Sequence, residues 1–591
     1  MARNRYDVDE VLETPFDFAH LKRSFVYIKK YKGKMITALV LSVFAAISGL
    51  LGPLITQYAL DNTIPQKNMG QLVLLTLAFI GTIAVSIIFS TIRSRIMTVV
   101  GQDIIFDIRT DLFKHLQELP FEYYDNRPHG KILIRVVNYV NSVSDMLSNG
   151  IINVILECLN MVFITVFMFF VNVKLSLVVL SGLPIFAVIM MMIKKRQRKA
   201  WQDVSNKSSN LNAYLQENIT GARVTQIFTR EEENAEIFDR LSEKYRKSWM
   251  NAVKYSNLVW PATDNVSTLV RAAIFVVGLL VLTPAAVSLG TVVAMTSYAS
   301  SFWQPIMNLS NIFNNFINNI AYLERIFETL DEPATIADKP NAQDIGNITG
   351  EVKFDDVTFS YEQGKTVLEH ISFDVKSGES VALVGPTGAG KSTVVSLLSR
   401  FYDVDSGKIT IDGKDISQAT LHSLRSQMGI MLQDSFIFSG TIYDNIRYGR
   451  LDATQQEIED AAKVVCADEF IKEMKDGYMT EVNERGSKLS GGQKQLISFA
   501  RTLLSDPKIL VLDEATSSID ARTEKLLQQG LQRLLVGRTS FIIAHRLSTI
   551  KNCDKIMYID NKGIAECGTH DELIAKKGEY YKLYTAQHMD E

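Results

Sequence analysis

The first half of the sequence contains apolar runs long enough to cross a lipid bilayer, and no other feature constrains the fold as strongly. A helix needs about 20 apolar residues to span the hydrocarbon core. Six such runs lie near Met35–Leu60, Gln71–Arg93, Leu147–Val171, Lys174–Ile193, Leu258–Leu282 and Gly290–Trp303. A helical pattern continues past the last of them. We therefore predict an all-α membrane domain over residues 35–330, with six transmembrane helices extended into the cytoplasm.

The connections between these runs alternate in length and charge. Three are short, whereas the second-to-third and fourth-to-fifth connections are long and charged. Lys and Arg gather on the long side, at Arg93, Arg95 and Lys194–Lys199. The positive-inside rule places that side, and both termini, in the cytoplasm. An even number of spans agrees with this orientation.

Residues 1–34 precede the first predicted span. The first 18 residues carry charges and a proline and have no apolar core, so we do not expect a secretory signal. The stretch His20–Lys34 interleaves basic and aromatic residues, which is typical of an amphipathic elbow helix at a membrane surface. A solvated charged helix is the alternative.

Composition limits the classes of protein that remain. The chain has 591 residues, more than one core usually supports, so two or more domains are expected. Hydrophobic residues make up 47% of the chain, which is high for a soluble protein of this size. The net charge of −3 argues against a nucleic-acid binder. The four cysteines include no close CxxC pair, so neither a disulfide framework nor a zinc site is indicated.

The second half of the sequence reads as a separate soluble domain. Residues 331–349 contain the prolines, acids and small residues of a linker. Over residues 350–591, short β-type runs such as SVALVG, ILVLDE and SFIIAH alternate with helical patterns. This alternation predicts an α/β domain with a largely parallel core sheet.

A phosphate-binding loop lies in this domain. The run GPTGAGKS follows the strand-like SVALV and opens a helix, which is the context that this motif requires. Glycines let the backbone aim N–H groups at phosphate oxygens, and the helix N-terminus adds positive potential. Lys391 is expected to reach the β- and γ-phosphates, and Ser392 to ligate Mg²⁺. The predicted loop residues are Gly385, Pro386, Thr387, Gly388, Ala389, Gly390, Lys391, Ser392 and Thr393.

Two acidic residues complete the nucleotide motif. The strand-like run KILVLDE ends in Asp513 and Glu514, and open α/β sheets bind ligands at the carboxyl ends of their strands. Asp513 is expected to hold Mg²⁺ directly or through water, and Glu514 to polarise the attacking water. The domain is thus an α/β P-loop ATPase or GTPase domain, and these motifs alone specify no more.

A third motif decides between classes. The run KLSGGQKQLISFAR, Lys488–Arg501, passes from a Ser-Gly-Gly turn into a helix and forms a second anion-binding helix start. One small domain hardly needs two such starts for one triphosphate, so the second makes sense as a contact to a partner's nucleotide. With this run the sequence resembles the ATP-binding-cassette family, specifically exporters with six spans fused to one cassette, over nearly the whole chain. The signature that carries the resemblance is Leu489, Ser490, Gly491, Gly492 and Gln493.

The resemblance implies roles for further residues. Tyr361 resembles the aromatic residue that stacks on adenine, and Gln433 the glutamine that senses Mg²⁺ and the membrane domain. Asp520, in the run SSID, resembles the loop that links two sites, and His545 the histidine that contacts the γ-phosphate. The implied catalytic residues are then Glu514, His545 and Gln433, and the implied metal ligands Ser392, Gln433 and Asp513.

The resemblance also implies elements that couple the domains. We place them at Glu118–Gly130 and Tyr214–Glu233, in the two long connections, and solvated helical hairpins are the alternative. The run Thr480–Gly486 resembles the segment that links cassette to coupling helix. Asn483 stands where the family usually has Gly, which leaves the detailed turn open.

In this family two cassettes enclose two ATP molecules head to tail, so the functional unit implied is a dimer with ATP and Mg²⁺ as cofactors. Because Glu514 and the signature are both intact, a homodimer would own two complete sites. The run QLISFAR resembles one half of heterodimeric bacterial exporters, which favours a heterodimer. A bacterial plasma membrane is the location that the family resemblance implies.

Several polar groups fall within or beside the predicted spans. A charge in lipid is costly, so Glu157, Asp264 and Arg271 are expected to face a cavity, a partner helix or each other. Asp264 and Arg271 are seven residues apart and can share a helix face. Asn311, Asn315 and Asn318 recur at helical spacing and are expected to face a water-filled inner cavity. Both a role in the substrate path and purely structural pairing stay open.

The function implied is export of hydrophobic or amphipathic compounds, of the multidrug type, by alternating access and driven by ATP hydrolysis. A lipid or peptide exporter or flippase is the alternative within transport. A membrane regulatory ATPase that moves no cargo is a second alternative. The spans disfavour a soluble ATPase of this family acting on nucleic acid.

Overall fold

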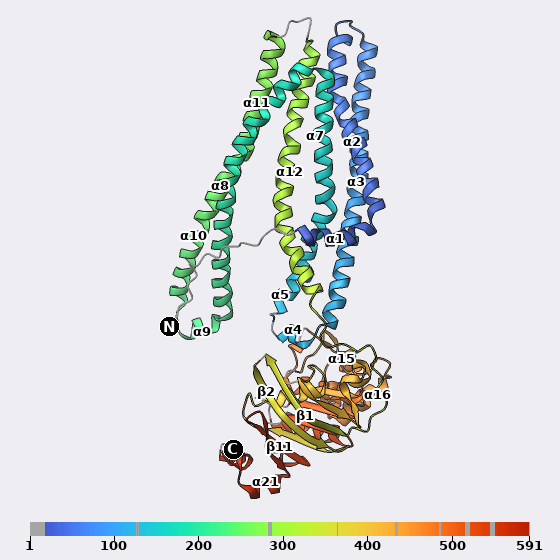
Figure 1. Ribbon diagram of the computed structural model, residues 1–591, viewed down its shortest axis with the longest axis vertical. Helices are drawn as coiled ribbons and strands as arrows, with labels where there is room; N and C mark the ends of the chain where they lie inside the picture. Colours follow the sequence, from blue (N-terminus) through green and yellow to red (C-terminus); the bar gives the residue numbers. More distant parts are fainter. Residues whose placement is uncertain are drawn as a thin grey trace. The chain divides into compact units, whose positions relative to one another are not determined.

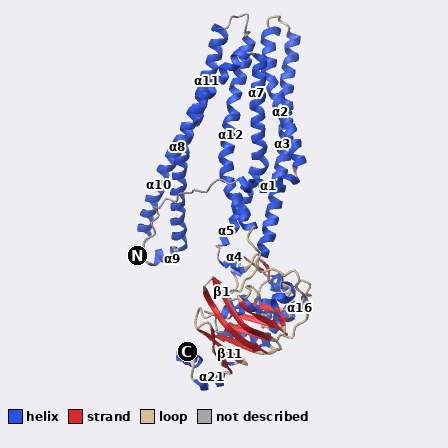
Figure 2. Ribbon diagram, in the orientation of Figure 1, coloured by secondary structure: helices blue, strands red, loops and turns tan. Residues whose placement is uncertain are grey.

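The computed structural model describes residues 18–125, 127, 129–281, 287–362, 364–431, 435–483, 486–513, 521–543 and 550–589. The chain forms two compact units, each described by itself below. The first comprises Met1–Gln117 with His129–Glu332, and the second comprises Glu118–Pro128 with Pro333–Glu591. In Figure 2 the strands all belong to the second unit, and the first is helical.

The first unit is built from long helices (Figure 1). Short helical and π-helical segments join them at η1 (Ala59–Thr63), α5 (His129–Ile134), η2 (Arg135–Tyr139), α6 (Val140–Asp145), η3 (Met146–Gly150), α9 (Ala222–Ile227) and η4 (Val277–Val281). The long helices, with the shorter α1, are α1 (Phe18–Lys30), α2 (Lys32–Tyr58), α3 (Met69–Glu118), α7 (Ile151–Val171), α8 (Val173–Thr220), α10 (Glu231–Asn257), α11 (Val259–Val276) and α12 (Leu289–Leu330).

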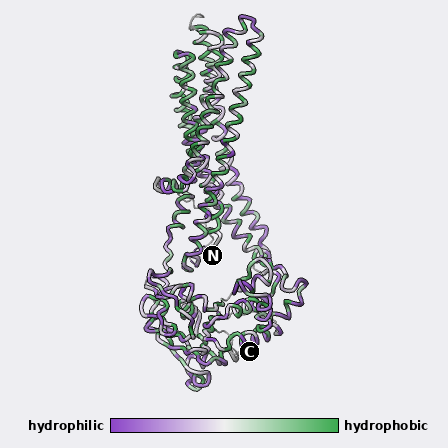
Figure 3. The backbone as a smooth tube through the Cα atoms, turned by 90° about the vertical axis from the view of Figure 1, so that its right-hand side faces the viewer, coloured by the Kyte–Doolittle hydropathy of each residue, from purple (hydrophilic) through white to green (hydrophobic). Residues whose placement is uncertain are grey.

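Five helical stretches in the described residues are long and apolar enough to cross a membrane: Lys32–Thr63, Met69–Glu118, Ile132–Val171, Val173–Thr220 and Glu231–Leu280. They contain the first four predicted spans, and the last of them contains the predicted fifth span, Leu258–Leu282, as far as Leu280. Figure 3 shows hydrophobic residues concentrated along one part of these helices and hydrophilic residues along their extensions. The extensions agree with the expectation of helices that continue past the membrane.

The sixth predicted span lies in α12 and is less apolar than the others because serine and threonine interrupt it. Their hydroxyls donate to carbonyl oxygens one turn earlier, for example Thr296 to Val292 at 2.8 Å and Ser300 to Thr296 at 2.9 Å. Such bonds satisfy a hydroxyl inside a helix. One face of α12 is buried in the bundle, where Tyr298, Phe302 and Trp303 are at most 2% exposed. A helix packed mainly against other helices does not need a continuous lipid-facing surface.

Small residues let the helices approach closely around α12. A Cβ added to Gly182 of α8 would lie 2.6 Å from a methyl of Val270 in α11 and 3.2 Å from the Trp303 ring. Contacts under 3.0 Å do not occur without displacement. Gly182 is therefore a position at which α8, α11 and α12 pack closely.

The start of α12 is bound to the end of the first span by a carboxylate. Asp61 accepts hydrogen bonds from the backbone N–H of Gly290 at 2.8 Å and from the Ser288 hydroxyl at 2.5 Å. The Gln57 amide donates to the Thr291 hydroxyl at 2.9 Å. A carboxylate at a helix N-terminus satisfies otherwise unpaired N–H groups and interacts favourably with the helix dipole.

The second unit is an α/β domain with two main sheets. A six-stranded sheet has the order β12-β11-β3-β10-β9-β6, parallel except for the edge strand β12. This agrees with the predicted parallel core. A four-stranded antiparallel sheet, β2-β1-β4-β5, and a small β7-β8 pair were not predicted as separate sheets. The strands are β1 (Val352–Glu362), β2 (Lys365–Val375), β3 (Ser380–Val384), β4 (Ser406–Ile411), β5 (Lys414–Asp415), β6 (Met428–Met431), β7 (Gly440–Thr441), β8 (Glu481–Val482), β9 (Ile509–Asp513), β10 (Thr539–Ile543), β11 (Lys555–Asp560) and β12 (Gly563–Gly568).

Alternation along the central strand builds two cores. Val381 and Leu383 of β3 belong to the core shared with the antiparallel sheet, whereas Ala382 and Val384 belong to the core under the helices. Side chains of a strand point to opposite faces in turn, so one strand supports both layers. The helices of this unit are α4 (Phe121–Asp125), α13 (Lys391–Leu398), α14 (Leu421–Arg425), α15 (Ile442–Arg447), α16 (Gln455–Val464), α17 (Asp468–Glu473), α18 (Gly491–Leu504), α19 (Ala521–Leu535), α21 (His570–Lys576) and α22 (Glu579–Met589).

We predict that Gly290→Ala destabilises the first unit. The added Cβ would lie 2.6 Å from both Asp61 carboxylate oxygens and from the backbone oxygen of Gln57. Overpacking of this kind costs about 1–3 kcal/mol. Gly81→Ala in α3 is the matched control, because its Cβ would meet nothing within 4 Å. The melting temperature of the purified full chain in detergent should fall by several degrees for Gly290→Ala only, and equal melting of the two variants would refute the assignment.

Candidate functional site

Three neighbouring parallel strands end together at one edge of the large sheet. Leu383 of β3 pairs with Ile543 of β10, and Ile543 pairs with Asp513 of β9. The phosphate loop follows β3 directly, and Asp513 is the last residue of β9. Since neighbouring strands are about 4.8 Å apart, the loop and this carboxylate lie on the same edge within side-chain reach of a common ligand. This is the edge at which open α/β sheets bind ligands.

Glycine is required in the loop for conformation and for space. Gly385, Gly388 and Gly390 have φ values of +141°, +83° and +105°. A Cβ at Gly385 would lie 2.1 Å from the carbonyl oxygen of Ile559, and one at Gly390 would lie 2.7 Å from a methyl of Leu368. The loop therefore packs against the sheet by its backbone. Its outer residues are exposed: Pro386, Thr387 and Gly388, with Ala389 half-buried.

Lys391, the first residue of α13, folds back into the loop. Its ammonium donates to the carbonyl oxygens of Gly385 at 2.8 Å and Pro386 at 2.9 Å. Burial lowers the pKa of this amine, and the negative charge of Asp513 counteracts that shift. A cation held beside a concave run of backbone N–H groups is the chemistry that binds phosphate. The following Ser392 is exposed on the first turn of α13.

Tyr361 of β1 lies beside this helix with part of its ring accessible. Its hydroxyl is 3.1 Å from the hydroxyl of buried Thr393. Its ring is nearly perpendicular to the rings of Phe359 and Tyr402, with ring centroids 4.9 Å and 5.1 Å away. The side chain is 44% exposed, so an aromatic surface fixed in place remains open to a stacking partner.

The signature run forms the start of α18. The Ser490 hydroxyl accepts from the Gln493 backbone N–H at 3.2 Å, and the Gln493 side chain accepts from the Ser490 N–H at 3.0 Å. Leu489 is buried beneath this turn. A Cβ on Gly491 would meet nothing within 4 Å, so the first turn of the helix is open outward. Gly492, next to it, is buried. This helix start can receive an anion from another molecule.

Four predicted site residues lie outside the described part of the chain: Gln433, Glu514, Asp520 and His545. Two residues of the run Thr480–Gly486 also lie outside it. Three of these residues, Gln433, Glu514 and His545, follow strands that end at the same side of the sheet as the phosphate loop. These strands are β6, β9 and β10, which close at Met431, Asp513 and Ile543.

The segment Glu118–Pro128 is folded into the second unit, although the sequence around it belongs to the first. The Phe121 and Phe401 rings are 4.2 Å apart, and the Tyr402 hydroxyl donates to the Asp125 carboxylate at 2.9 Å. The Arg425 guanidinium lies 5.2 Å from the Phe401 ring centre. Burial and the Asp125 carboxylate raise the pKa of Tyr402. This is the first predicted coupling element.

The surface that receives this segment was not predicted from the sequence. The sequence feature that could have indicated this surface is the aromatic pair Phe401–Tyr402, shortly after the helix that follows the phosphate loop. Because Tyr402 contacts both Asp125 and Tyr361, its ring connects the segment to the residue expected to stack on the nucleotide. The second predicted coupling element contains the short helix α9 and the start of α10.

The predicted polar residues of the spans are paired in part. The Arg271 guanidinium lies 4.0 Å from the Asp264 carboxylate, as their spacing predicted, and also donates to Thr268. Glu157 of α7 accepts a hydrogen bond of 2.6 Å from Asn308 of α12.

The partner of Glu157 was not predicted, because the two residues are 151 positions apart. Gln304 donates to Asn308 as well, at 3.0 Å. Asn311 and Asn315, further along α12, are exposed.

An apolar cavity of about 480 Å³ lies between α8 and α12 in the first unit. The Thr263 hydroxyl lies 3.3 Å from the Met307 sulfur beside it. Methionine is flexible and polarizable and adapts to apolar surfaces of different shape. The lining residues are Leu183, Pro184, Phe186, Ala187, Met190, Met191, Ile306, Met307 and Ser310.

Family models match both halves of the chain. The model of the ABC transporter transmembrane region matches residues 35–306, and the ABC transporter model matches residues 368–517. Among curated relatives, the uncharacterized ABC transporter ATP-binding protein YknV of Bacillus subtilis is 41% identical over 590 residues, covering 100% of this chain and 98% of the relative.

Two further relatives carry functional names. The putative multidrug export ATP-binding/permease protein YgaD of Bacillus subtilis is 34% identical over 96% of this chain and 100% of its own length. The fatty acid ABC transporter ATP-binding/permease protein of Mycobacterium bovis is 37% identical over 84% of this chain and 78% of its own length.

Among solved structures, a bacterial Atm1-family ABC exporter with ATP bound matches with a TM-score of 0.77 and 28% identity. The match covers 97% of this chain and 99% of that one. Exporters of this type function as dimers. These matches thus extend over nearly the full length of ABC transporter ATP-binding/permease proteins and of a solved exporter. The chain therefore belongs to the ABC transporter family, as a multi-pass membrane exporter whose ATPase is coupled to transport.

Proposed function

We propose that the exporter moves hydrophobic or amphipathic compounds of the multidrug type. The observation that carries this proposal is the methionine-lined cavity between α8 and α12. Its volume falls in the range of small-molecule sites, about 300–1,000 Å³. Three methionines line it, Met190, Met191 and Met307, and such a surface accepts varied apolar cargo.

The pair Glu157–Asn308 supports an amphipathic rather than a purely apolar cargo. Asn308 follows Met307 of the cavity lining along α12. A carboxylate in this part of the protein favours a cargo that carries a positive charge beside an apolar body. The fatty acid relative supports the alternative of a lipid cargo. Export of a peptide, or a regulatory ATPase without cargo, has no specific observation in its favour.

The residues at the carboxyl ends of the parallel strands are arranged as an ATP-binding site requires. Lys391 binds the β- and γ-phosphates, the loop N–H groups hold their oxygens, and the exposed ring of Tyr361 stacks on adenine. Ser392 and Asp513 offer the hard oxygen ligands that Mg²⁺ prefers, with Gln433 as a third. When bound there, Mg²⁺ would supply positive charge that offsets the charge of the phosphates. Glu514 polarises the attacking water, and His545 orients the γ-phosphate.

Each ATP is shared between two chains in this proposal. The open start of α18, with Ser490 and Gly491, faces the phosphates held by the partner chain, and Asp520 connects the two sites. We favour a heterodimer over a homodimer, on the run QLISFAR. The nucleotide-binding side, with both termini, lies in the cytoplasm, and the spans lie in a bacterial plasma membrane. We also retain the division into an N-terminal segment (1–34), membrane domain (35–330), linker (331–349) and cassette (350–591).

We expect Glu514→Gln to nearly abolish ATP hydrolysis while ATP binding stays intact, because the amide cannot take up a proton from water. The measurement is phosphate release by the full chain purified alone in lipid, beside the variant. Robust activity lost in the variant would mean a self-sufficient homodimer and would refute the heterodimer. Retention of most turnover by the variant would refute the role of Glu514.

Lys391→Ala should weaken ATP binding at least tenfold, since it removes the cation held inside the loop. Lys508→Ala is the control, because this exposed lysine precedes β9 at the opposite edge of the sheet. Titration of a fluorescent ATP analogue measures both affinities. Unchanged affinity in Lys391→Ala would contradict the phosphate contact.

The cargo proposal predicts a selective effect of Glu157→Gln. Apparent affinity for tetraphenylphosphonium, read from stimulation of ATPase activity, should fall about fivefold, which corresponds to about 1 kcal/mol. Stimulation by a neutral apolar compound should not change. Glu232→Gln, on an exposed position of α10, is the charge-matched control. Loss of both responses would mean a structural role for Glu157, and stimulation by palmitate alone would favour the lipid alternative.

A further inference from the structure

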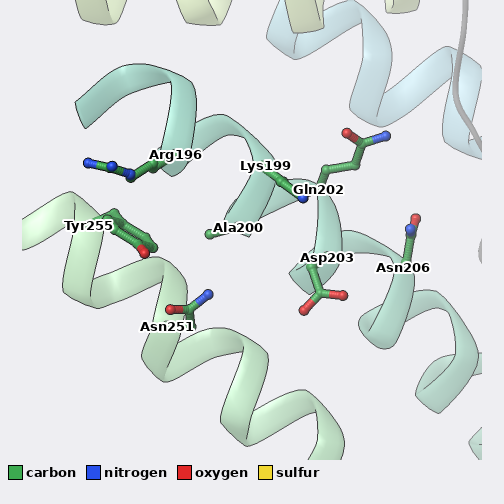
Figure 4. A pocket seen from close by; sticks show the side chains of 8 residues that line it. All are labelled: Arg196, Lys199, Ala200, Gln202, Asp203, Asn206, Asn251 and Tyr255. Carbon is green, nitrogen blue, oxygen red and sulfur yellow. The ribbon is translucent and has the colours of Figure 1, made fainter. Parts of the chain in front are cut away.

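A second cavity of about 420 Å³ lies on the extension of the first unit, between α8 and α10 (Figure 4). Its chemistry is opposite to that of the methionine-lined cavity. α8 contributes two cations, Arg196 and Lys199, together with Asp203 and Asn206, and α10 contributes Asn251 and Tyr255. In Figure 4 Arg196 and Tyr255 lie toward one end of the cavity and Asp203 and Asn206 toward the other.

The walls of this polar pocket are held in place by contacts between the two helices. Ala200 and Ala252 are buried between α8 and α10, at 5% and 0% exposure. The Ser248 hydroxyl of α10 donates to the Asp203 carboxylate. Ser256, further along α10, accepts from Gln197 of α8 at 3.1 Å. The pocket is therefore pre-formed, which reduces the entropy lost when a ligand binds.

The two basic residues of the pocket, Arg196 and Lys199, lie along α8 at the depth of the headgroup layer of a bilayer. The apolar part of this helix ends at Ile193, and the basic run Lys194–Lys199 follows at once. At 1.5 Å per residue, Arg196 and Lys199 lie about 5–9 Å beyond the hydrocarbon edge. The headgroup region occupies about 5–8 Å on each side of a bilayer. Asp203 and Asn206 lie further out, toward water.

Aromatic side chains lie next to the pocket on its water-facing side, and Trp201 is about 12 Å past Ile193 along α8. The Trp201 and Trp249 rings contact each other edge to face at 5.3 Å, and the Trp201 N–H donates to the Ser256 hydroxyl at 3.0 Å. Tyr245 packs on Trp249 at 5.8 Å. Each of the two tryptophans is more than a third exposed, so this surface faces its surroundings.

We propose that the pocket between α8 and α10 binds the phosphodiester headgroup of an anionic glycerophospholipid. Arg196 and Lys199 bind the phosphate, because guanidinium and ammonium groups are the strong partners of phosphate oxygens. Asp203 and the amides of Asn206 and Asn251 accept from and donate to the hydroxyls of a glycerol headgroup that extends toward water. Basic pockets between helices on the cytoplasmic side are a recognised form of lipid site.

The carboxylate makes the pocket selective among phosphates. Asp203 repels a second negative charge but accepts hydrogen bonds from hydroxyls, so a monoanionic phosphatidylglycerol fits better than a dianionic phosphate. The acyl chains remain in the bilayer beside α8 and add to the binding free energy. A water-soluble phosphate with the same headgroup chemistry lacks that contribution.

Native mass spectrometry of the full chain in detergent tests the proposal, with dioleoylphosphatidylglycerol, dioleoylphosphatidylcholine and glycerol 3-phosphate as probes. We expect phosphatidylglycerol to bind at least fivefold more tightly than phosphatidylcholine. The double variant Arg196→Gln/Lys199→Gln should bring this ratio close to one. The matched control Lys195→Gln/Arg198→Gln removes the same charge from the same turns of α8, outside the pocket lining, and should keep most of the preference.

Three results would overturn the proposal. An equal loss in both double variants would mean that general attraction to the basic run, not the pocket, holds the lipid. Absence of any preference in the unmodified chain would refute a headgroup site. Binding of glycerol 3-phosphate as tight as that of the lipid would assign the pocket to a soluble phosphate.

Folding of the variants is checked by their melting temperature and by binding of the fluorescent ATP analogue. If the double variant is unstable, the single substitution Lys199→Gln should lower the lipid preference at least twofold. An unchanged preference in that variant would refute the role of Lys199.

Discussion

Every backbone N–H and C=O must find a hydrogen-bond partner, and lipid offers none. This constraint explains why the described residues of the first unit form helices and no strands, and why η1 and η4 continue the helical hydrogen bonding as π-helix. It also explains how α12 tolerates its serines and threonines, whose hydroxyls donate to carbonyls of the preceding turn. In the second unit, where water is available, the same requirement is met by two sheets, and the edge of the larger one remains open for phosphate.

Local patterns predicted most of this architecture. The spans follow from run length, and the phosphate loop follows from a strand, glycines and a lysine in consecutive positions. Both depend only on neighbours in the sequence. The lower hydropathy of α12 reflects its position inside the bundle. That position depends on contacts with distant helices and cannot be predicted from a local sequence pattern. The separate antiparallel sheet was likewise missed, because β1, β2 and β4 read as ordinary strands until their pairing is known.

Contacts between distant residues could not be predicted. Asp61 of the first span binds the start of α12, 229 positions away at Gly290, and Glu157 binds Asn308. Each pairing satisfies a polar group that would otherwise be costly in a water-poor environment. The sequence indicated that the charge of Glu157 is costly in a membrane span, but it did not indicate which residue would bind that carboxylate. The polar pocket between α8 and α10 escaped notice for a similar reason, since the basic run was sufficiently explained by membrane orientation.

The segment Glu118–Pro128 has a practical consequence for work on the isolated ATPase. A fragment cut at residue 333 would leave these residues behind, although they pack on Phe401 and bind Tyr402. Such a fragment would expose an uncovered aromatic surface next to Tyr361. A nucleotide affinity measured on it would therefore differ from that of the complete unit. Supplying the missing strip as a short synthetic peptide, or tethering it to the fragment, would restore a complete unit for crystallisation and titration.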